Sequence, residues 1–363
     1  MSKKAYLILE NGTVFEGKSF GAEGQAIGEV VFSTSMVGYL ETLTDPSNFG
    51  QIVVQTFPLI GNYGIVTENF ETEKTYAKAY IVREWCQNPS NFRCEGVLDT
   101  FLKDNGIIGL YDIDTRQLTK IIRETGVMNG MIVSGQLPEN VADEIKNYTI
   151  VDAVKNVTCE KTVEYKAEDG KYNVVVMDMG LKNSTKQQLL GRGCNLTVVP
   201  ATTTAEQIVA LKPDGIFIST GPGDPAENTD VIAELKKLMQ YKIPTFGVGL
   251  GHQLLALSQG AKTVKLKYGH RGANIPAVNT DTRRVHITSQ NHGYAVLSST
   301  LPVYATPSFI NANDDTCEGV SYTKFPAFSV QFDPDAAKGE LHTSYLFDKF
   351  TDLIKEVNVN AVK

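Results

Sequence analysis

The feature that most constrains the fold is a repeated pattern of short apolar runs and helical segments in the second half of the chain. The runs cover residues 174–177, 196–199, 215–218 and 245–248 and are almost continuously apolar. A strand that is covered on both faces has this pattern, whereas a strand with one hydrated face alternates apolar and polar residues. Because helical segments separate the runs, the pattern predicts a parallel sheet with helices on both faces.

The first half of the chain is richer in strands. Its apolar runs are separated by turn signals such as Asn11-Gly12 and Asp45-Pro46. We predict strands at 5–9, 28–33, 51–56 and 79–83, and helices at 100–105 and 115–124. The sequence therefore predicts an α/β protein with a β-rich α/β domain at 1–150, a charged linker at 151–172 and a mostly parallel α/β domain at 173–363.

Composition excludes several classes of partner. The net charge of −7 argues against nucleic acid, because phosphate binding needs a surplus of Lys and Arg. No apolar stretch approaches the roughly 20 residues that span a bilayer, so no membrane association is expected. The five cysteines are scattered and form no CxxC pair. This pattern indicates reduced thiols, a cytoplasmic location and no metal site.

Three segments follow predicted strands, where open α/β sheets place their ligands. The first is Ser219–Pro225, with the sequence STGPGDP. Its glycines, Gly221 and Gly223, would let backbone N–H groups approach a ligand as half of an oxyanion hole. The same residues are also typical of a tight turn, and taken alone this segment favours the turn.

The second segment, Phe246–Gln253, has the strand–turn–helix pattern of a nucleophile elbow. An elbow presents a Ser or Cys at its apex, but the apex here is Gly249. A phosphate-binding loop is a weaker alternative, because the segment lacks the Gly-Lys-Ser/Thr ending of a P-loop. Glycine adopts the strained elbow backbone without the usual cost, so we expect an intact turn and a destabilising effect of Gly249→Cys.

The third segment is Gln331–Asp335, which contains two carboxylates, Asp333 and Asp335. Carboxylates at this spacing could bind a cation, and a more speculative form of this hypothesis is an ammonium site. They could equally cap the N-terminus of a helix, and taken alone the segment favours the cap.

Together these segments resemble class I (triad) glutamine amidotransferases, which have a flavodoxin-like fold, and in particular the small-subunit family of carbamoyl phosphate synthetase. The resemblance covers essentially the whole chain. Its motifs are Met36–Tyr39, Leu43–Ser47, Gly61–Gly64 and Asp112–Arg116 in the first half, and ISTGPGDP, GLGHQLLAL, Ser289–Tyr294 and Tyr345–Asp348 in the second.

The resemblance implies a glutamine site and a partner. Backbone N–H groups of Gly221 and Leu250 would face the amide oxygen. The implied partner is the large subunit in a heterodimer, which would bind ATP and magnesium and make carbamoyl phosphate for arginine or pyrimidine biosynthesis, leaving this chain without a cofactor. The residues implied to bind glutamine are Ser47, Gly221, Gly223, Leu250, Gln253, Asn291, Gly293 and Tyr294.

The catalytic triad of the family is not preserved. The family mechanism needs a cysteine nucleophile, a histidine and a glutamate, but the matching positions are Gly249, Asp333 and Asp335. Glycine cannot form a thioester, and an aspartate titrates near pH 4, far from the range of a neutral acid–base catalyst. Loss of all three favours a natural subunit without glutaminase activity over an engineered knock-out or a sequencing error.

Three functions remain open at this point. The first is a structural or regulatory subunit whose large partner uses free ammonia. The second is a sensor that binds glutamine without hydrolysing it. The third is an active glutaminase with an unrecognised nucleophile, for which His252 and His292 lie within the glutamine motifs but none of the cysteines does.

Overall fold

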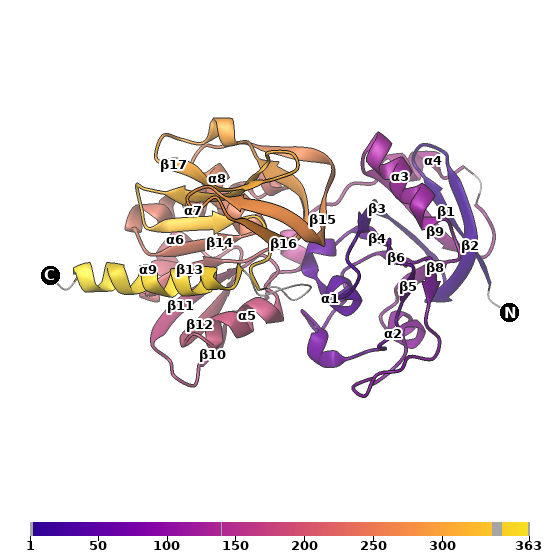
Figure 1. Ribbon diagram of the computed structural model, residues 1–363, viewed down its shortest axis with the longest axis horizontal. Coiled ribbons are helices and arrows are strands. Elements are labelled where there is room, and N and C mark those ends of the chain that lie inside the picture. Colours follow the sequence, from indigo (N-terminus) through magenta and orange to yellow (C-terminus); the bar gives the residue numbers. More distant parts are fainter. Residues whose placement is uncertain (1–2, 139, 336–342, 362–363) are drawn as a thin grey trace. The chain divides into compact units, whose positions relative to one another are not determined.

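The computed structural model of the chain describes residues 3–138, 140–335 and 343–361 (Figure 1). The chain folds into two compact units. The first unit comprises Met1–Ala153 and Lys267–Gly272, and the second comprises Val154–Leu266 and Ala273–Lys363. The short segment Lys267–Gly272, far along the sequence, therefore belongs to the first unit, which the sequence did not predict.

The first unit is built on a closed seven-stranded barrel with the strand order β1-β2-β8-β6-β4-β3-β9. Alternate residues of each strand point inward, as Leu7 and Leu9 do in β1 and as Ile52 and Val54 do in β4. The barrel strands are β1 (Lys4–Leu9), β2 (Val14–Gly21), β3 (Gln25–Ser33), β4 (Gln51–Gln55), β6 (Ala79–Ile81), β8 (Ile108–Tyr111) and β9 (Met128–Ser134).

Short helices complete this unit. They are α1 (Tyr39–Thr44), α2 (Leu98–Asp104), α3 (Thr115–Thr125) and α4 (Ala142–Lys146), and a small sheet joins β5 (Leu59–Ile60) to β7 (Glu84–Trp85). Helix α3 begins where the Asp114 carboxylate accepts a hydrogen bond from the Gln117 N–H, an N-cap. The predicted helices at 100–105 and 115–124 thus correspond to α2 and α3, whereas closure of the strands into a barrel was not predicted.

The second unit contains a ten-stranded sheet with the order β10-β12-β11-β13-β14-β19-β18-β16-β15-β17. The pairs from β12 through β11, β13 and β14 to β19 are parallel, as predicted. The strands are β10 (Val163–Tyr165), β11 (Tyr172–Asp178), β12 (Cys194–Pro200), β13 (Gly215–Ile218), β14 (Thr245–Val248), β15 (Thr263–Asn279), β16 (Val285–Val296), β17 (Ala305–Asn311), β18 (Cys317–Tyr322) and β19 (Ala327–Val330).

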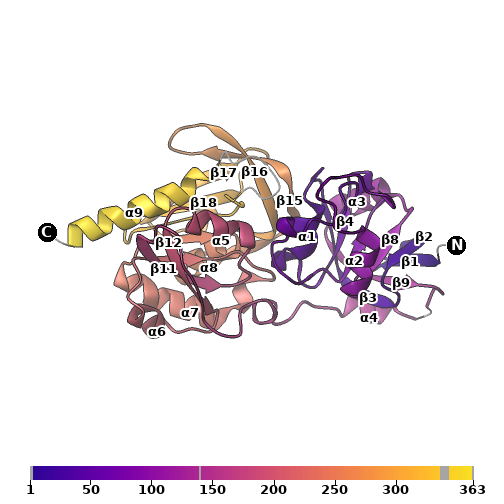
Figure 2. The same cartoon turned by 90° about the horizontal axis from the view of Figure 1, so that it is seen from below.

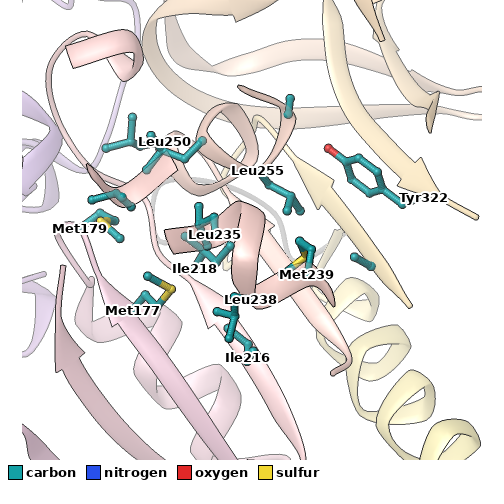
Figure 3. Packing of buried hydrophobic residues seen from close by; sticks show 14 of the residues in the cluster. Met177, Met179, Ile216, Ile218, Leu235, Leu238, Met239, Leu250, Leu255 and Tyr322 are labelled. Atoms are coloured by element: carbon teal, nitrogen blue, oxygen red, sulfur yellow. The ribbon is translucent and has the colours of Figure 1, made fainter. Parts of the chain in front are cut away.

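Helices cover both faces of the parallel strands, which explains the continuous apolar runs (Figure 2). In β13, Ile216 and Ile218 pack against α6 (Ala205–Ala210), α7 (Thr229–Leu238) and α8 (Leu250–Ser258). Phe217 between them packs on the opposite face against α9 (Tyr345–Ala361), and α5 (Asn183–Leu190) covers the same face. Figure 3 shows the first of these cores, with Leu235 and Leu238 of α7 directed at Ile216 and Ile218.

Two features of this unit differ from the sequence-based prediction. The segment 151–172, predicted to be a linker, includes β10, which pairs antiparallel with β12 and so is part of the sheet. The sheet also continues beyond β19 into an antiparallel half. No helix in the described part of the chain is long and apolar enough to cross a membrane.

The parallel strands gather the predicted site segments at one edge of the sheet. Strand β11 lies between β12 and β13. The chain therefore adds β12 on one side of β11 and then crosses over to add β13 on the other side. Such a switch in strand order leaves a crevice at the carboxyl ends of the strands, where ligands bind in open α/β sheets. The segments after β11, β13, β14 and β19 therefore meet there.

Candidate functional site

The predicted elbow is present between β14 and α8. Gly249 has φ of 58° and ψ of −113°, a backbone conformation that side chains strongly disfavour. The Gly249 N–H donates to the Val330 carbonyl at 2.9 Å, which fixes the turn to the end of β19. The turn therefore keeps the shape of a nucleophile elbow while its apex has no side chain.

Neighbouring glycines allow the close packing of this turn. A Cβ added at Gly247 would stand 2.8 Å from the Gly251 carbonyl oxygen, and one added at Gly251 would overlap the Ile218 carbonyl oxygen. The Gly251 N–H also donates to the Ser219 carbonyl at 3.1 Å. The glycines of this motif thus allow α8 to pack closely against the end of β13. This structural role is independent of any catalytic role of the turn.

The segment after β13 lies directly against the elbow. The Ser219 hydroxyl accepts from the Met179 N–H at 2.9 Å and donates to the Thr220 carbonyl at 3.0 Å. Gly221 follows, close enough to Leu250 that an added Cβ would stand 3.0 Å from its Cδ2. Because Leu250 begins a helix, its N–H has no acceptor within that helix. Gly221 and Leu250 are therefore adjacent, as an oxyanion hole requires.

The two aspartates after β19 bind a lysine. The Lys182 ammonium lies 2.9 Å from Asp333 Oδ1 and 3.3 Å from Asp335 Oδ1. The three side chains are 3%, 11% and 0% exposed, respectively, so this is a buried ionic cluster. The Thr185 hydroxyl also donates to Asp335 Oδ2. The structure thus gives both carboxylates a cationic partner within the chain, Lys182.

The turn after β11 directs Lys182 to this cluster. Asp178 Oδ1 accepts from the N–H groups of Gly180 and Leu181 at 2.9 and 2.7 Å, which reverses the chain. Lys182 then caps helix α5 with an extended backbone, and Thr185 lies in the first turn of that helix. The cluster therefore links the segment after β11 to the segment after β19.

This arrangement decides what the aspartates can do. Two buried carboxylates that share one ammonium would be strongly destabilising without it, because an unpaired buried charge costs several kcal/mol. An aspartate held in this way cannot relay a proton between a nucleophile and a leaving group as a histidine does. The hypothesis of an ammonium site must also accommodate the Lys182 ammonium, which already lies between the two carboxylates.

A polar network connects α8 to β16 and to the segment after β19. The Gln253 Nε2 donates to the Gln331 Oε1 and to the Tyr294 carbonyl, both at 2.8 Å. The Asp333 N–H donates to the Ser289 carbonyl at 2.9 Å. Strand β16, which carries the motif Ser289–Tyr294, therefore lies beside both α8 and the end of β19.

The implied glutamine-binding residues fall into two groups. Ser47 lies in the first unit, in a single 3-10 turn, with its N–H donating to the Asp45 carboxylate at 2.9 Å. The others lie in the second unit. They are Gly221 and Gly223 after β13, Leu250 and Gln253 in α8, and Asn291, Gly293 and Tyr294 in β16.

Both histidines of the motifs are engaged in hydrogen bonds. The His252 Nδ1 lies 2.8 Å from the Ser329 hydroxyl in the core, and burial lowers the pKa of His252 to about 3. His292 uses its two ring nitrogens on the Tyr294 carbonyl and the Gln290 side chain, at 2.8 and 2.9 Å. His342, a further histidine of the chain, lies outside the described residues.

The thiols of the second unit are not activated either. Burial raises the pKa of Cys159 and Cys194 to about 12, and that of Cys317 to about 11. At neutral pH these groups are thiols, and the thiolate is the nucleophilic form. The remaining cysteines, Cys86 and Cys94, lie in the first unit.

Two residues of this site were missed by the sequence analysis. Lys182 lies about 150 positions before the aspartates that it binds, and only the adjacency of the strand ends brings them together. Thr220 lies inside the STGPGDP motif, whose functional interpretation from sequence depends on the glycines. A buried pair of carboxylates was a usable signal for Lys182, since such a pair requires a cation nearby. Nothing in the sequence indicated the position of Thr220 relative to Gly249.

Comparison with known proteins first defines the class of the second unit. Residues 175–353 match the family Glutamine amidotransferase class-I. With its parallel sheet, its elbow and the adjacent Gly221 and Leu250, the second unit is a class I glutamine amidotransferase domain, as predicted.

The first unit and the whole-length relatives then define the family. Residues 7–132 match Carbamoyl-phosphate synthase small chain, CPSase domain. The carbamoyl phosphate synthase small chain of Clostridium perfringens is 48% identical, over 96% of this chain and 98% of that protein. Those of Fusobacterium nucleatum and Syntrophotalea carbinolica are 48% and 45% identical, over 98% and 97% of this chain and 98% of each protein. The chain belongs to the carbamoyl phosphate synthase small chain family.

Proposed function

We propose that this chain is a small subunit of carbamoyl phosphate synthase that does not hydrolyse glutamine. It acts on a large subunit as a structural or regulatory partner, and the nitrogen for carbamoyl phosphate comes from free ammonia. ATP and magnesium bind the large subunit, and this chain needs no cofactor of its own. The complex is a cytoplasmic heterodimer in its simplest form.

The observation that carries this proposal is the buried cluster of Lys182, Asp333 and Asp335 beside a glycine at the elbow. Amide hydrolysis by this class of domain needs a nucleophile, and a base within hydrogen-bond reach of it. Gly249 offers no nucleophilic atom. Both aspartates are committed to Lys182 at 2.9 and 3.3 Å.

The state of the remaining candidate groups supports the same conclusion. A histidine whose pKa is about 3 is a poor base at neutral pH, which applies to His252. Burial, which is partial for Cys159, raises the pKa of the Cys159, Cys194 and Cys317 thiols. Rescue of glutamine hydrolysis by these groups is therefore disfavoured on chemical grounds.

The nitrogen source of the assembled enzyme tests this proposal. The purified chain is mixed with a carbamoyl phosphate synthase large subunit, ATP, magnesium and bicarbonate, and carbamoyl phosphate is measured with either glutamine or ammonium chloride. We expect synthesis with ammonium and none with glutamine above a blank. A small subunit that hydrolyses glutamine serves as the positive control. Synthesis from glutamine at a rate comparable to that from ammonium would contradict the proposal.

A second candidate function is that of a glutamine sensor. The adjacency of Gly221 and Leu250 and the ordered side chain of Gln253 favour it, because these groups need no nucleophile to bind an amide. Isothermal titration of the chain with glutamine distinguishes this function from a purely structural one. Heat that saturates at one equivalent supports a sensor, and the absence of heat counts against it.

A further inference from the structure

Thr220 is the residue that faces the empty apex of the elbow. It follows Ser219 at the end of β13 and is 8% exposed. A Cβ added at Gly249 would overlap the Thr220 Oγ1, would stand 3.0 Å from the Thr220 Cβ and would stand 3.4 Å from its Cα. Real Cβ atoms essentially never make contacts below 3.0 Å, and a contact of 3.0 Å is unusually tight. Thr220 therefore fills the space in which a side chain at position 249 would begin.

The backbone around Thr220 prevents it from moving aside. The Ser219 side chain joins the Met179 N–H to the Thr220 carbonyl, at 2.9 and 3.0 Å. On the other side, Gly221 is packed so tightly that an added Cβ would overlap the Met179 carbonyl oxygen. Both neighbours of Thr220 are therefore fixed to the turn after β11.

Rotation of the Thr220 side chain gives only partial relief. Its Oγ1 and methyl group occupy two of the three staggered positions around Cβ, so two of the three rotamers keep a heavy atom at the apex and only the third turns a hydrogen there. The Thr220 Cβ itself stays 3.0 Å from the added carbon in each rotamer. A side chain at position 249 thus confines Thr220 to that one rotamer, and the remaining 3.0 Å contact with its Cβ requires a small shift of a constrained backbone.

We propose that Thr220 is a fourth position at which this site departs from a working glutaminase, because its side chain closes the elbow over Gly249. The steric part of this inference stands on geometry alone, and its consequence for activity rests on the proposed loss of glutamine hydrolysis. That consequence is that replacing Gly249, Asp333 and Asp335 by the family triad does not restore the site while Thr220 remains.

A double-mutant cycle tests the steric part. The unfolding midpoint in urea is measured for Gly249→Ala and Thr220→Ala, alone and together, in the full chain. We expect Thr220→Ala to reduce the effect of Gly249→Ala on the unfolding equilibrium about tenfold, which corresponds to about 1.4 kcal/mol. The strain of a side chain at φ of 58° and its 3.0 Å contact with the Cβ of residue 220 remain in both backgrounds, because alanine keeps that carbon. An effect of Gly249→Ala that is the same in both backgrounds overturns the proposal.

Two controls make this cycle specific. Thr220→Val keeps the branched shape without the hydroxyl, so it should relieve Gly249→Ala much less than Thr220→Ala does. Gly251→Ala meets the backbone of Ile218 and not Thr220, so its effect should be the same with Thr220→Ala as without it. If Gly249→Ala prevents folding, recovery of the folded state in the double variant supports the proposal, and failure to recover overturns it.

Glutamine hydrolysis tests the functional part. Ammonia release is measured for the triple variant Gly249→Cys, Asp333→His, Asp335→Glu, and for the same variant with Thr220→Ala. We expect release only from the fourfold variant. Equal rates in the two, including equal absence of activity, count against the role of Thr220. Release by the unaltered chain would instead contradict the proposed function, so the two failures are distinguishable.

Discussion

The two sides of the candidate site differ in what they retain. On the elbow side, Gly221, Gly249 and Leu250 keep the backbone arrangement of a glutamine amidotransferase. On the opposite side, Asp333 and Asp335 are held by Lys182 in a buried ionic cluster. The first side consists of backbone groups and the second of side chains. The backbone of the elbow is therefore present, while the positions that we predict to correspond to the family triad are Gly249, Asp333 and Asp335.

This difference shows what a preserved motif can mean. Gly251 contacts the Ile218 carbonyl and its N–H bonds to Ser219, so replacing it would disturb the packing of α8 on the sheet. Such glycines are needed for the fold, whether or not glutamine is hydrolysed. Asp333 and Asp335 contribute instead through their side chains, which pair with Lys182. A glycine-rich motif is thus evidence for the fold, and the side chains are evidence for the reaction.

The largest predicted effect on stability comes from a substitution in the ionic cluster of Lys182, Asp333 and Asp335. Lys182→Met should destabilise the chain by about 3–5 kcal/mol, because it leaves two buried carboxylates without their cation. Urea unfolding measures this effect. Lys103→Met is the matched control: Lys103 pairs with Asp99 at 2.5 Å on the surface and should contribute less than about 1 kcal/mol. Similar effects of the two substitutions would show that the cluster is not a structural element.

The next effect concerns His252, a histidine of the elbow motif. Burial lowers its pKa from an ordinary value near 6.5 to about 3. The unfolded chain therefore binds a proton between these pH values and the folded chain does not, so stability falls as the pH drops below about 6.5. Between pH 7 and pH 4 this group should account for about 3 kcal/mol.

The His252→Asn variant isolates this contribution. Asparagine can still bond to Ser329 but does not titrate, so the free energy of unfolding should fall less steeply from pH 7 to pH 4 than in the unaltered chain. An identical pH dependence in the two proteins would mean that His252 is not a buried neutral group.

A side chain at the elbow should also destabilise the chain. Gly249→Cys places a Cβ at φ of 58° and against Thr220, and backbone strain alone costs about 1–3 kcal/mol. Gly106→Cys is the control, because Gly106 has φ of +68° with open space around it, so it reports strain without overlap. Thermal unfolding should rank Gly249→Cys below Gly106→Cys. A Gly249→Cys variant more stable than the unaltered chain would contradict this account of the elbow.

The smallest effect is expected for Gln253→Leu. This change removes the donor to the Gln331 side chain and the Tyr294 carbonyl, so about 1–2 kcal/mol should be lost. Gln240→Leu, at an exposed position of the chain, should change the urea midpoint little. If the two variants unfold alike, the polar network beside the elbow contributes nothing to stability.

The sequence predicted the parallel part of the second unit well, because a strand covered on both faces leaves a continuous apolar run. Val174–Met177 and Gly215–Ile218 are examples, and both belong to interior strands of the sheet. Closure of the first unit into a barrel was not predictable, since it depends on which strands pair and not on the pattern within any strand.

The same limit applies to the site. The elbow was predictable because Phe246–Gln253 is contiguous in sequence, and Gly249 lies at its apex as expected. The cluster was not, because Lys182 meets Asp333 and Asp335 only through the order of β11, β13, β14 and β19. The overlap between Thr220 and position 249 depends on atomic positions that no residue pattern carries.

The central claim is that this chain does not hydrolyse glutamine, and ammonia release from glutamine tests it most directly. The purified chain is assayed alone and with a large subunit, beside a glutamine-hydrolysing small subunit of the same family. The account predicts no ammonia above the blank in either sample of this chain. Ammonia release by the unaltered chain would contradict the claim and would mean that a group other than the three replaced residues acts as the nucleophile.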